Sequence, residues 1–176
     1  MNQNFTYRQL NYADAKQYRK LRLLSLQLHP KNFLSKYADQ VKLEEMFMEK
    51  CLRENDLNNL MFGAFEKDEL VGICGFNRGN KEIMLHSGEI IQIFVIPEKS
   101  GNKVGFNLLS FSINNLFQKD GIEQISLWVN ADIVSANKVY EQVGFKECGY
   151  MKNAFKENNE YKDLRIMAIY KNDPKT

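Results

Sequence analysis

The sequence predicts an α/β protein in which helices flank a mixed β-sheet. Three observations support this fold class. Apolar residues recur every three or four positions in some segments and every second position in others, which are the spacings of amphipathic helices and of strands. Two strand-then-helix units occupy the second half of the chain, with a predicted hairpin on either side of them. The length of 176 residues suits one folding unit, and we expect a single domain over residues 1–176.

The first 59 residues predict one strand and two helices. Residues 5–10 alternate as a short strand, and Asn11 or Asp14 can cap the helix that follows, which should end near Pro30. The basic side chains expected on the outer face of this helix are Lys16, Arg19, Lys20 and Arg22. A second helix is expected over residues 39–52. Its apolar face should comprise Leu43, Phe47 and Cys51.

From residue 60 the spacing changes to that of strands. Residues 89–96 are almost continuously apolar and rich in β-branched side chains, which predicts a central strand covered on both faces, and Pro97 ends it. Cys74, Trp128 and Cys148 lie in strand patterns and are expected in the core. The other expected elements are strands over 60–66 and 70–77, a helix over 102–119 ended by Asp120-Gly121, a strand over 124–129, a helix over 133–143 ended by Gly144, and an antiparallel pair over 145–155 and 161–170.

Composition and charge argue against several classes of protein. Lys plus Arg number 24 and Asp plus Glu 22, a net charge of +2, so a nucleic-acid partner is not expected. Cys51, Cys74 and Cys148 form no Cys-x-x-Cys pair, which argues against a disulfide framework or a zinc site and favours a reducing compartment. The N-terminal residues lack an apolar signal core, and the longest apolar stretch, 90–96, is interrupted by Gln92. We therefore expect a cytoplasmic protein with no membrane partner.

The connection after the central strand is the first candidate for a binding site. Residues 97–105 read Pro-Glu-Lys-Ser-Gly-Asn-Lys-Val-Gly and direct backbone N–H groups outward at a helix N-terminus, which favours phosphate. Gly101 and Gly105 let the backbone approach a ligand closely, and Lys99 and Lys103 add positive charge. The spacing fits neither a Walker A loop nor Gly-x-Gly-x-x-Gly. On local sequence alone, an ordinary glycine-punctuated turn is the alternative.

Two motifs and the element order place this loop in a larger pattern. Residues 95–105 are similar to an acetyl-CoA signature, Val-x-Pro followed by (Arg/Gln)-x-x-Gly-x-(Gly/Ala). Residues 136–145, Ala-Asn-Lys-Val-Tyr-Glu-Gln-Val-Gly-Phe, are similar to Ala-x-x-(Leu/Val)-Tyr-x-x-x-Gly-Phe. Together they make the chain resemble the GNAT N-acetyltransferase superfamily over nearly its whole length. The resemblance implies a GNAT-like acyl-CoA N-acyltransferase fold with a mostly antiparallel central sheet, and acetyl-CoA as co-substrate without a metal.

The resemblance also implies which residues bind acetyl-CoA. These are Phe94, Val95, Ile96, Ser100, Gly101, Asn102, Lys103, Val104, Gly105, Asn130 and Asn137. Ser100 stands where the family usually has Arg or Gln, and Lys103 where it usually has Gly. A positive φ at Lys103 would cost on the order of 1 kcal/mol, which a right-handed conformation would avoid. Ile133 stands where the family often has Asn, so Asn130 or Asn137 is the candidate for that role.

Direct acetyl transfer to a primary amine has three chemical requirements, and the resemblance suggests a candidate for each. Glu89, or a water chain, would take the proton from an amine whose pKa is about 10. A backbone N–H within 94–96 would stabilise the oxyanion of the tetrahedral intermediate, at the point where the central strand parts from its neighbour. Tyr140 would protonate the leaving thiolate. From the residues alone, Glu89 also reads as a solvated charge and Tyr140 as a core aromatic.

The acceptor is expected to be an amine of a small molecule or of a protein. Phe33, Tyr37 and Tyr161 are candidates for the acceptor pocket, since the family builds that wall from the first helices and the last hairpin. Charges of both signs on the last hairpin indicate no acceptor charge. A homodimer is left open. The alternative function is a non-catalytic acyl-CoA-binding or sensing module, which the departures at Lys103 and Ile133 favour.

Overall fold

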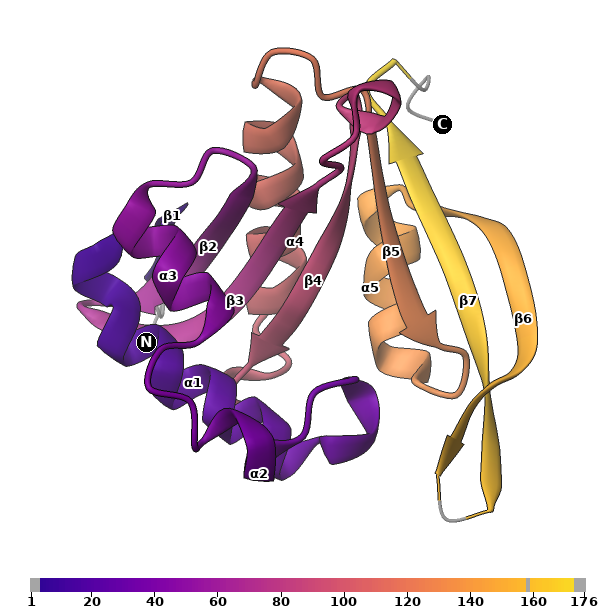
Figure 1. Cartoon of the computed structure of the whole chain (residues 1–176), viewed down its shortest axis with the longest axis horizontal. Helices are drawn as coiled ribbons and strands as arrows, with labels where there is room; N and C mark the ends of the chain where they lie inside the picture. Colours follow the sequence, from indigo (N-terminus) through magenta and orange to yellow (C-terminus); the bar gives the residue numbers. More distant parts are fainter. Residues whose placement is uncertain (1–3, 158, 173–176) are drawn as a thin grey trace.

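A computed structural model describes residues 4–157 and 159–172 (Figure 1). Residues 1–3 of the N-terminal segment and Asn158 in the connection of the last hairpin lie outside the described residues. In the described part, seven strands form one sheet of order β1-β2-β3-β4-β5-β7-β6. They are β1 Phe5–Gln9, β2 Asn59–Glu66, β3 Glu69–Arg78, β4 Ser87–Val95, β5 Gln124–Asn130, β6 Lys146–Glu157 and β7 Glu160–Tyr170. Only β4 and β5 of these pair in parallel, so the predicted mixed, mostly antiparallel sheet is confirmed.

Helices cover both faces of this sheet. They are α1 Ala15–Leu28, α2 Tyr37–Gln40, α3 Phe47–Glu54, α4 Val104–Phe117 and α5 Val134–Val143, with short 3₁₀ helices η1 Tyr12–Asp14, η2 Pro30–Asn32, η3 Glu82–Met84 and η4 Pro97–Lys99. In Figure 1, α1 and α3 lie on one face of β1–β4, and α4 lies on the other. No helix in the described residues is long and apolar enough to cross a membrane.

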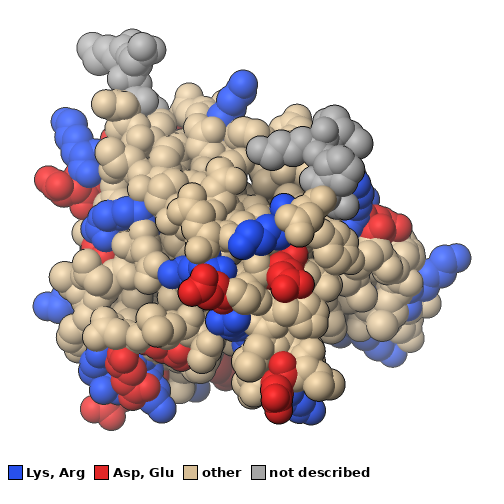
Figure 2. Space-filling model, turned by 90° about the horizontal axis from the view of Figure 1, so that it is seen from above, with Lys and Arg blue, Asp and Glu red and all other residues tan. Residues whose placement is uncertain are grey.

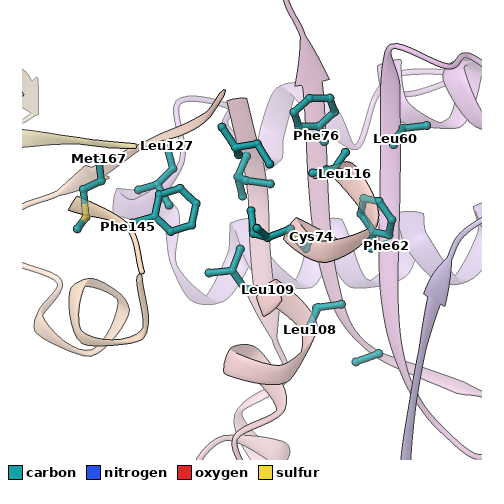
Figure 3. Close-up of a cluster of buried hydrophobic side chains, with 14 of the residues drawn as sticks. Leu60, Phe62, Cys74, Phe76, Leu108, Leu109, Leu116, Leu127, Phe145 and Met167 are labelled. Carbon is teal, nitrogen blue, oxygen red and sulfur yellow. The ribbon is translucent and has the colours of Figure 1, made fainter. Parts of the chain in front are cut away.

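Each face of the sheet carries its own hydrophobic core. Phe62 and Phe76 point toward α4, where Leu109 packs against them in the cluster drawn in Figure 3. Met61, the neighbour of Phe62, points to the opposite face and packs with Tyr18 of α1. Strand side chains alternate between faces with a period of two, so adjacent residues of β2 serve the two cores. The continuous apolar character of β2 and β3 follows from cover on both sides.

The predicted ends of two helices are confirmed. The Asn11 side-chain oxygen accepts a hydrogen bond from the Ala13 backbone N–H at 2.9 Å, and the Asp14 carboxylate accepts one from the Asn11 N–H at 2.9 Å. These bonds cap the 3₁₀ turn η1, which leads directly into α1, whereas Asp14 makes no side-chain cap bond to α1 itself. At the other end of the chain, Gly144 adopts φ 113°, a left-handed conformation that ends α5 and favours glycine.

The predicted helix over residues 39–52 is wrong. The chain forms the single turn α2, then an irregular segment, then α3. The Arg19 guanidinium donates to the backbone oxygens of Leu43 at 3.0 Å and Glu44 at 2.8 Å. A continuous helix would use both oxygens for its own i to i+4 bonds. The Glu49 carboxylate accepts from the Met46 N–H at 2.7 Å and so starts a new helix, and Leu43 is exposed rather than part of an apolar face.

Two further expectations about burial are wrong. Trp128 is 54% exposed and Cys148 is exposed, although both lie in strands. The expectation for the central strand is confirmed, because Ile90 packs in the core on one face of the sheet and Phe94 in the core on the other. The β4 residues between them are only half-buried, and together with Trp128 they line a cavity.

Charged groups of both signs are intermingled on the face seen from above in Figure 2, as the nearly balanced composition requires.

Candidate active site

The cavity lies where β4 and β5 part. The two strands pair in parallel over only three residues each, from Ser87 with Gln124 to Glu89 with Ser126. Beyond Glu89 they diverge, as the lower half of Figure 1 shows. A cavity of about 700 Å³ lies at this divergence, lined by both strands and by parts of α1, η2, α5 and β6. The predicted parting of the central strand is therefore confirmed, and it leaves the edge of β4 facing the cavity.

A β-bulge sets the geometry of that edge. Gly75 pairs with Ile91 and Ile73 with Phe94, so two residues of β4, Gln92 and Ile93, stand opposite one residue of β3. Gln92 has φ 55°, in the left-handed region. The buried Tyr18 hydroxyl donates to the Gln92 side-chain oxygen at 2.9 Å. The bulge is thus tied to α1 by one side-chain hydrogen bond.

The bulge and the ladder decide which backbone donor faces the cavity. The Ile96 N–H is bonded to the Val71 carbonyl at 3.0 Å, so it is engaged by β3. Ladder bonds alternate along an antiparallel strand, so the Phe94 N–H also points toward β3 and the Val95 N–H points away from it. Of the three residues predicted to supply an oxyanion donor, Val95 is the one whose geometry fits.

Two residues near the end of the loop from 97 to 103 adopt a positive φ. Gly101 has φ 85° and Lys103 has φ 56°. The right-handed alternative for Lys103 is therefore wrong, and the chain bears a cost on the order of 1 kcal/mol there. The Lys99 ammonium lies 2.7 Å from a Glu66 carboxylate oxygen, so its charge is already paired, whereas Lys103 is exposed.

The start of α4 fits an anionic ligand. The N–H groups of Val104 and Gly105 belong to the first turn, which has no intrahelical acceptors and carries the positive end of the helix dipole. A Cβ atom built on Gly105 would come no closer than 3.7 Å to another protein atom, and one on Gly101 would meet nothing within 4 Å. Protein packing thus gives no reason for glycine at Gly105, where it costs about 1 kcal/mol relative to Ala. A ligand that approaches the backbone closely would give a reason for glycine at this position.

Glu89 and Tyr140 line the same cavity. Glu89 is half-buried on the last paired rung of β4, and burial raises the pKa of its carboxyl above the ordinary value of 4.5. Tyr140 lies on α5 with its ring 6.3 Å from that of Phe145. Burial, with a smaller contribution from Cys74, raises the pKa of its phenol above the ordinary value of 10. The two groups therefore sit in an environment that favours a proton on each.

The two candidate asparagines differ in what their side chains do. The Asn137 amide donates to the backbone oxygens of Ile133, Ala131 and Asn130 at 2.9, 3.2 and 3.3 Å, and its oxygen accepts from Arg165 at 2.9 Å. It holds the connection from β5 to α5 together. Asn130 lines the cavity, and its side-chain oxygen accepts from the Asp132 N–H at 2.9 Å.

The acceptor side of the cavity differs in part from expectation. Phe33 lines it, whereas Tyr37 and Tyr161 are not among the lining residues. Arg22, expected on the outer face of its helix, is 4% exposed and lines the cavity as well. Its position four residues after Tyr18 places both side chains on one face of α1, and this spacing is the signal that could have located it.

Comparison with known proteins identifies the family. The Acetyltransferase (GNAT) domain family matches residues 7–166, so the chain belongs to the GNAT acetyltransferases, which transfer the acetyl group of acetyl-CoA. A spermidine N(1)-acetyltransferase of Vibrio cholerae is 25% identical over 174 residues, covering 96% of this chain and 94% of that protein.

Solved structures share the fold. A GNAT acetyltransferase from Streptococcus pneumoniae has a TM-score of 0.82 at 21% identity, covering 95% of this chain and 99% of its own. A putative acetyltransferase from Salmonella typhimurium, solved with its cofactor acetyl-CoA, has a TM-score of 0.81 at 16% identity, covering 98% of this chain and 97% of its own.

Proposed function

We propose that the protein transfers the acetyl group of acetyl-CoA directly to a primary amine, with Glu89 as general base and Tyr140 as general acid. The observation that carries this proposal is that both side chains line the one cavity where β4 and β5 part. The acceptor is an amine of a small molecule or of a protein.

The pKa shifts favour these roles. An alkylammonium group has a pKa of about 10 and must lose a proton before it can attack a carbonyl, and a carboxylate with a raised pKa is a stronger base for that step. A phenol whose pKa is raised stays protonated at neutral pH and can give its proton to a leaving thiolate. The opposite assignment would make Tyr140 the base and Glu89 the acid. The raised pKa of Tyr140 disfavours it, because the phenol would have to lose its proton before it could act as a base.

We assign the binding of acetyl-CoA to the edge of β4 and the start of α4. The Val95 N–H points away from β3, Asn130 lines the cavity, and residues 100–105 present first-turn N–H groups with the exposed Lys103 beside them. Acetyl-CoA supplies an activated thioester and anionic phosphates. The chain's part is to orient that thioester beside Glu89 and to exclude water from it.

The first test measures acetyl-CoA binding through the melting temperature, with ATP as a control for generic phosphate binding. A ligand at about 100 times its dissociation constant adds roughly 2.7 kcal/mol to the free energy of unfolding. A rise with acetyl-CoA alone supports the assigned site. No rise with either ligand contradicts it.

The second test measures thiol release from acetyl-CoA with a panel of primary amines, and mass spectrometry of the acetylated product. Glu89→Gln should lower kcat/KM at pH 7 by about 10²–10⁴-fold, the usual contribution of a general base, while the melting-temperature rise with acetyl-CoA persists. Glu123→Gln, a change at an exposed carboxylate outside the cavity lining, should behave as wild type. Equal activity of the two variants would remove Glu89 from the mechanism.

A further inference from the structure

The arginines of this chain are paired, with one exception. Arg8, Arg19, Arg53 and Arg165 each donate to a carboxylate within 3.0 Å, and Arg78 donates to two backbone oxygens. Arg22 has no carboxylate partner among the described residues. Its hydrogen-bond partner there is the Ser25 hydroxyl, at 3.4 Å. The guanidinium carbon lies 4.6 Å from the centre of the Phe33 ring, which holds the group from one side.

The free nitrogens of Arg22 face the cavity. The residue is 4% exposed and lines the cavity with Phe33. No side-chain nitrogen or oxygen among the described residues is both closed off from solvent and without a hydrogen-bond partner. The guanidinium nitrogens without an acceptor must therefore reach the cavity surface. Burial lowers the pKa of Arg22, yet an arginine remains charged in proteins, so the cavity contains an uncompensated positive charge.

Most of the other charges around the cavity are also positive. Lys31, Lys36 and Lys156 line it, and Glu89 is the one acidic side chain among its lining residues. Lys31 has a partner, Glu160, at 3.5 Å, but both groups are largely exposed and the pair is weak. A polycationic amine entering this cavity would meet like charges, whereas an amine that also carries an anion would meet a matching one.

The phosphates of acetyl-CoA do not account for this charge. Residues 97–105, to which phosphate binding is assigned, are not part of the cavity lining. Arg22 belongs instead to the part of the lining that α1 and the segment 29–36 supply. Asn130 and Tyr140 belong to a different part, which β5 and α5 supply. The acceptor is therefore the candidate source of an anion that binds Arg22.

We propose that Arg22 determines acceptor specificity, and that the acceptor is a primary amine bearing an oxyanion, a carboxylate or a phosphate, which the guanidinium binds. This rests on the proposed function and deepens it. The planar fork of arginine matches two oxygens of a carboxylate or phosphate, and such charge-assisted bonds are stronger than neutral ones. The Vibrio cholerae relative is named for spermidine, a polycation, so the two proteins would differ in acceptor class.

The test uses amines that differ only in the anion. Lysine is compared with 1,5-diaminopentane, and phosphoethanolamine with ethanolamine, by kcat/KM in the thiol-release assay. One or two charge-assisted bonds correspond to a preference of about 10- to 100-fold for the anionic member. Which pair shows the larger ratio identifies carboxylate or phosphate.

Variants separate binding from packing. Arg22→Met, which keeps volume without charge, should raise KM for the amine that bears an anion at least 10-fold and leave kcat/KM for the matched amine without the anion within about 3-fold of wild type. Arg22→Lys should restore part of the preference. Arg53→Met, at an exposed ion pair, serves as control. Two results would overturn the proposal. One is a wild-type preference for the amines without the anion, and the other is an equal loss of kcat/KM for both members of a pair in Arg22→Met.

A binding readout keeps the inference separate from the proposed function. The melting temperature is measured with glutarate and with inorganic phosphate, against sodium chloride of equal ionic strength, in wild type and Arg22→Met. A rise in melting temperature that depends on Arg22 supports the oxyanion site, whether or not an amine is acetylated. Failure to acetylate any amine would contradict the proposed function but not this site. Absence of any Arg22-dependent rise with both anions overturns the inference, whatever the activity.

Discussion

Tyr140→Phe separates a catalytic phenol from a packing aromatic, because the change removes one oxygen and keeps the ring. The hydroxyl makes no hydrogen bond to any described residue, and the ring keeps its contact with Phe145 at 6.3 Å. Loss of a hydroxyl that has no protein partner and reaches the cavity costs little, so the free energy of unfolding should change by less than about 1 kcal/mol. The melting temperature should stay within a few degrees of wild type.

Catalysis should respond far more strongly than stability. General acid catalysis contributes about 10²–10⁴-fold, which corresponds to about 2.7–5.4 kcal/mol of transition-state stabilisation. Because burial raises the pKa of Tyr140 above 10, the phenol is protonated throughout the neutral range. The deficit of Tyr140→Phe should therefore be constant between about pH 6 and pH 9.

The assay measures initial rates of thiol release at saturating acetyl-CoA over that pH range, together with the dissociation constant for acetyl-CoA. Tyr170→Phe, at a half-exposed position on β7, is the control. A kcat within about 3-fold of wild type refutes the acid assignment. A loss of kcat that is matched by an equal loss of affinity or by a large fall in melting temperature indicates a packing role instead.

Three other predictions follow from the same geometry. Because burial raises the pKa of Glu89, kcat/KM should fall on acidification at a pH above the carboxyl's usual 4.5, and Glu89→Gln should remove that limb of the pH profile. Gly88→Ala would place a Cβ 2.3 Å from the buried Phe76 ring, so thermal unfolding should show a loss of about 1–3 kcal/mol. Hydrogen bonds from Arg8 lower the pKa of Asp14 in the folded state. The pair therefore stabilises the fold above the unfolded pKa of about 3.9, and this stabilisation is lost as the pH falls through the lower folded pKa. In denaturant titrations at several pH values, Asp14→Asn should reduce this dependence of stability on acid.

The order of elements could be predicted because its signals are local. Pro97 and Gly144 end their elements through their own backbone restrictions, and the continuous apolar runs of β2 and β3 reflect cover on both faces. These features are set by the segments themselves. The parting of β4 and β5 is not local, and it was predicted from the family resemblance of motifs on either side of it; the pairing stops after Glu89.

The break between α2 and α3 could not be predicted from the segment itself. Its cause is Arg19, more than twenty residues earlier, whose guanidinium binds the two carbonyl oxygens that a continuous helix would need. Arg22 was misplaced for a related reason. Local patterns assign a charged residue to the solvent side, whereas this one is buried at a cavity that only the assembled fold creates.

The open edge of β4 connects the sequence to the proposed site. Its continuous apolar character predicts cover on both faces, and Ile90 and Phe94 pack in the cores on opposite faces of the sheet. The strand is nevertheless only half-buried between them, because its pairing with β5 stops at Glu89 and leaves one edge open to a cavity of about 700 Å³. An open strand edge presents backbone groups with which an extended ligand can pair. In the proposed function, the pantetheine arm of acetyl-CoA would bind along this edge, and its binding would add to the free energy of unfolding.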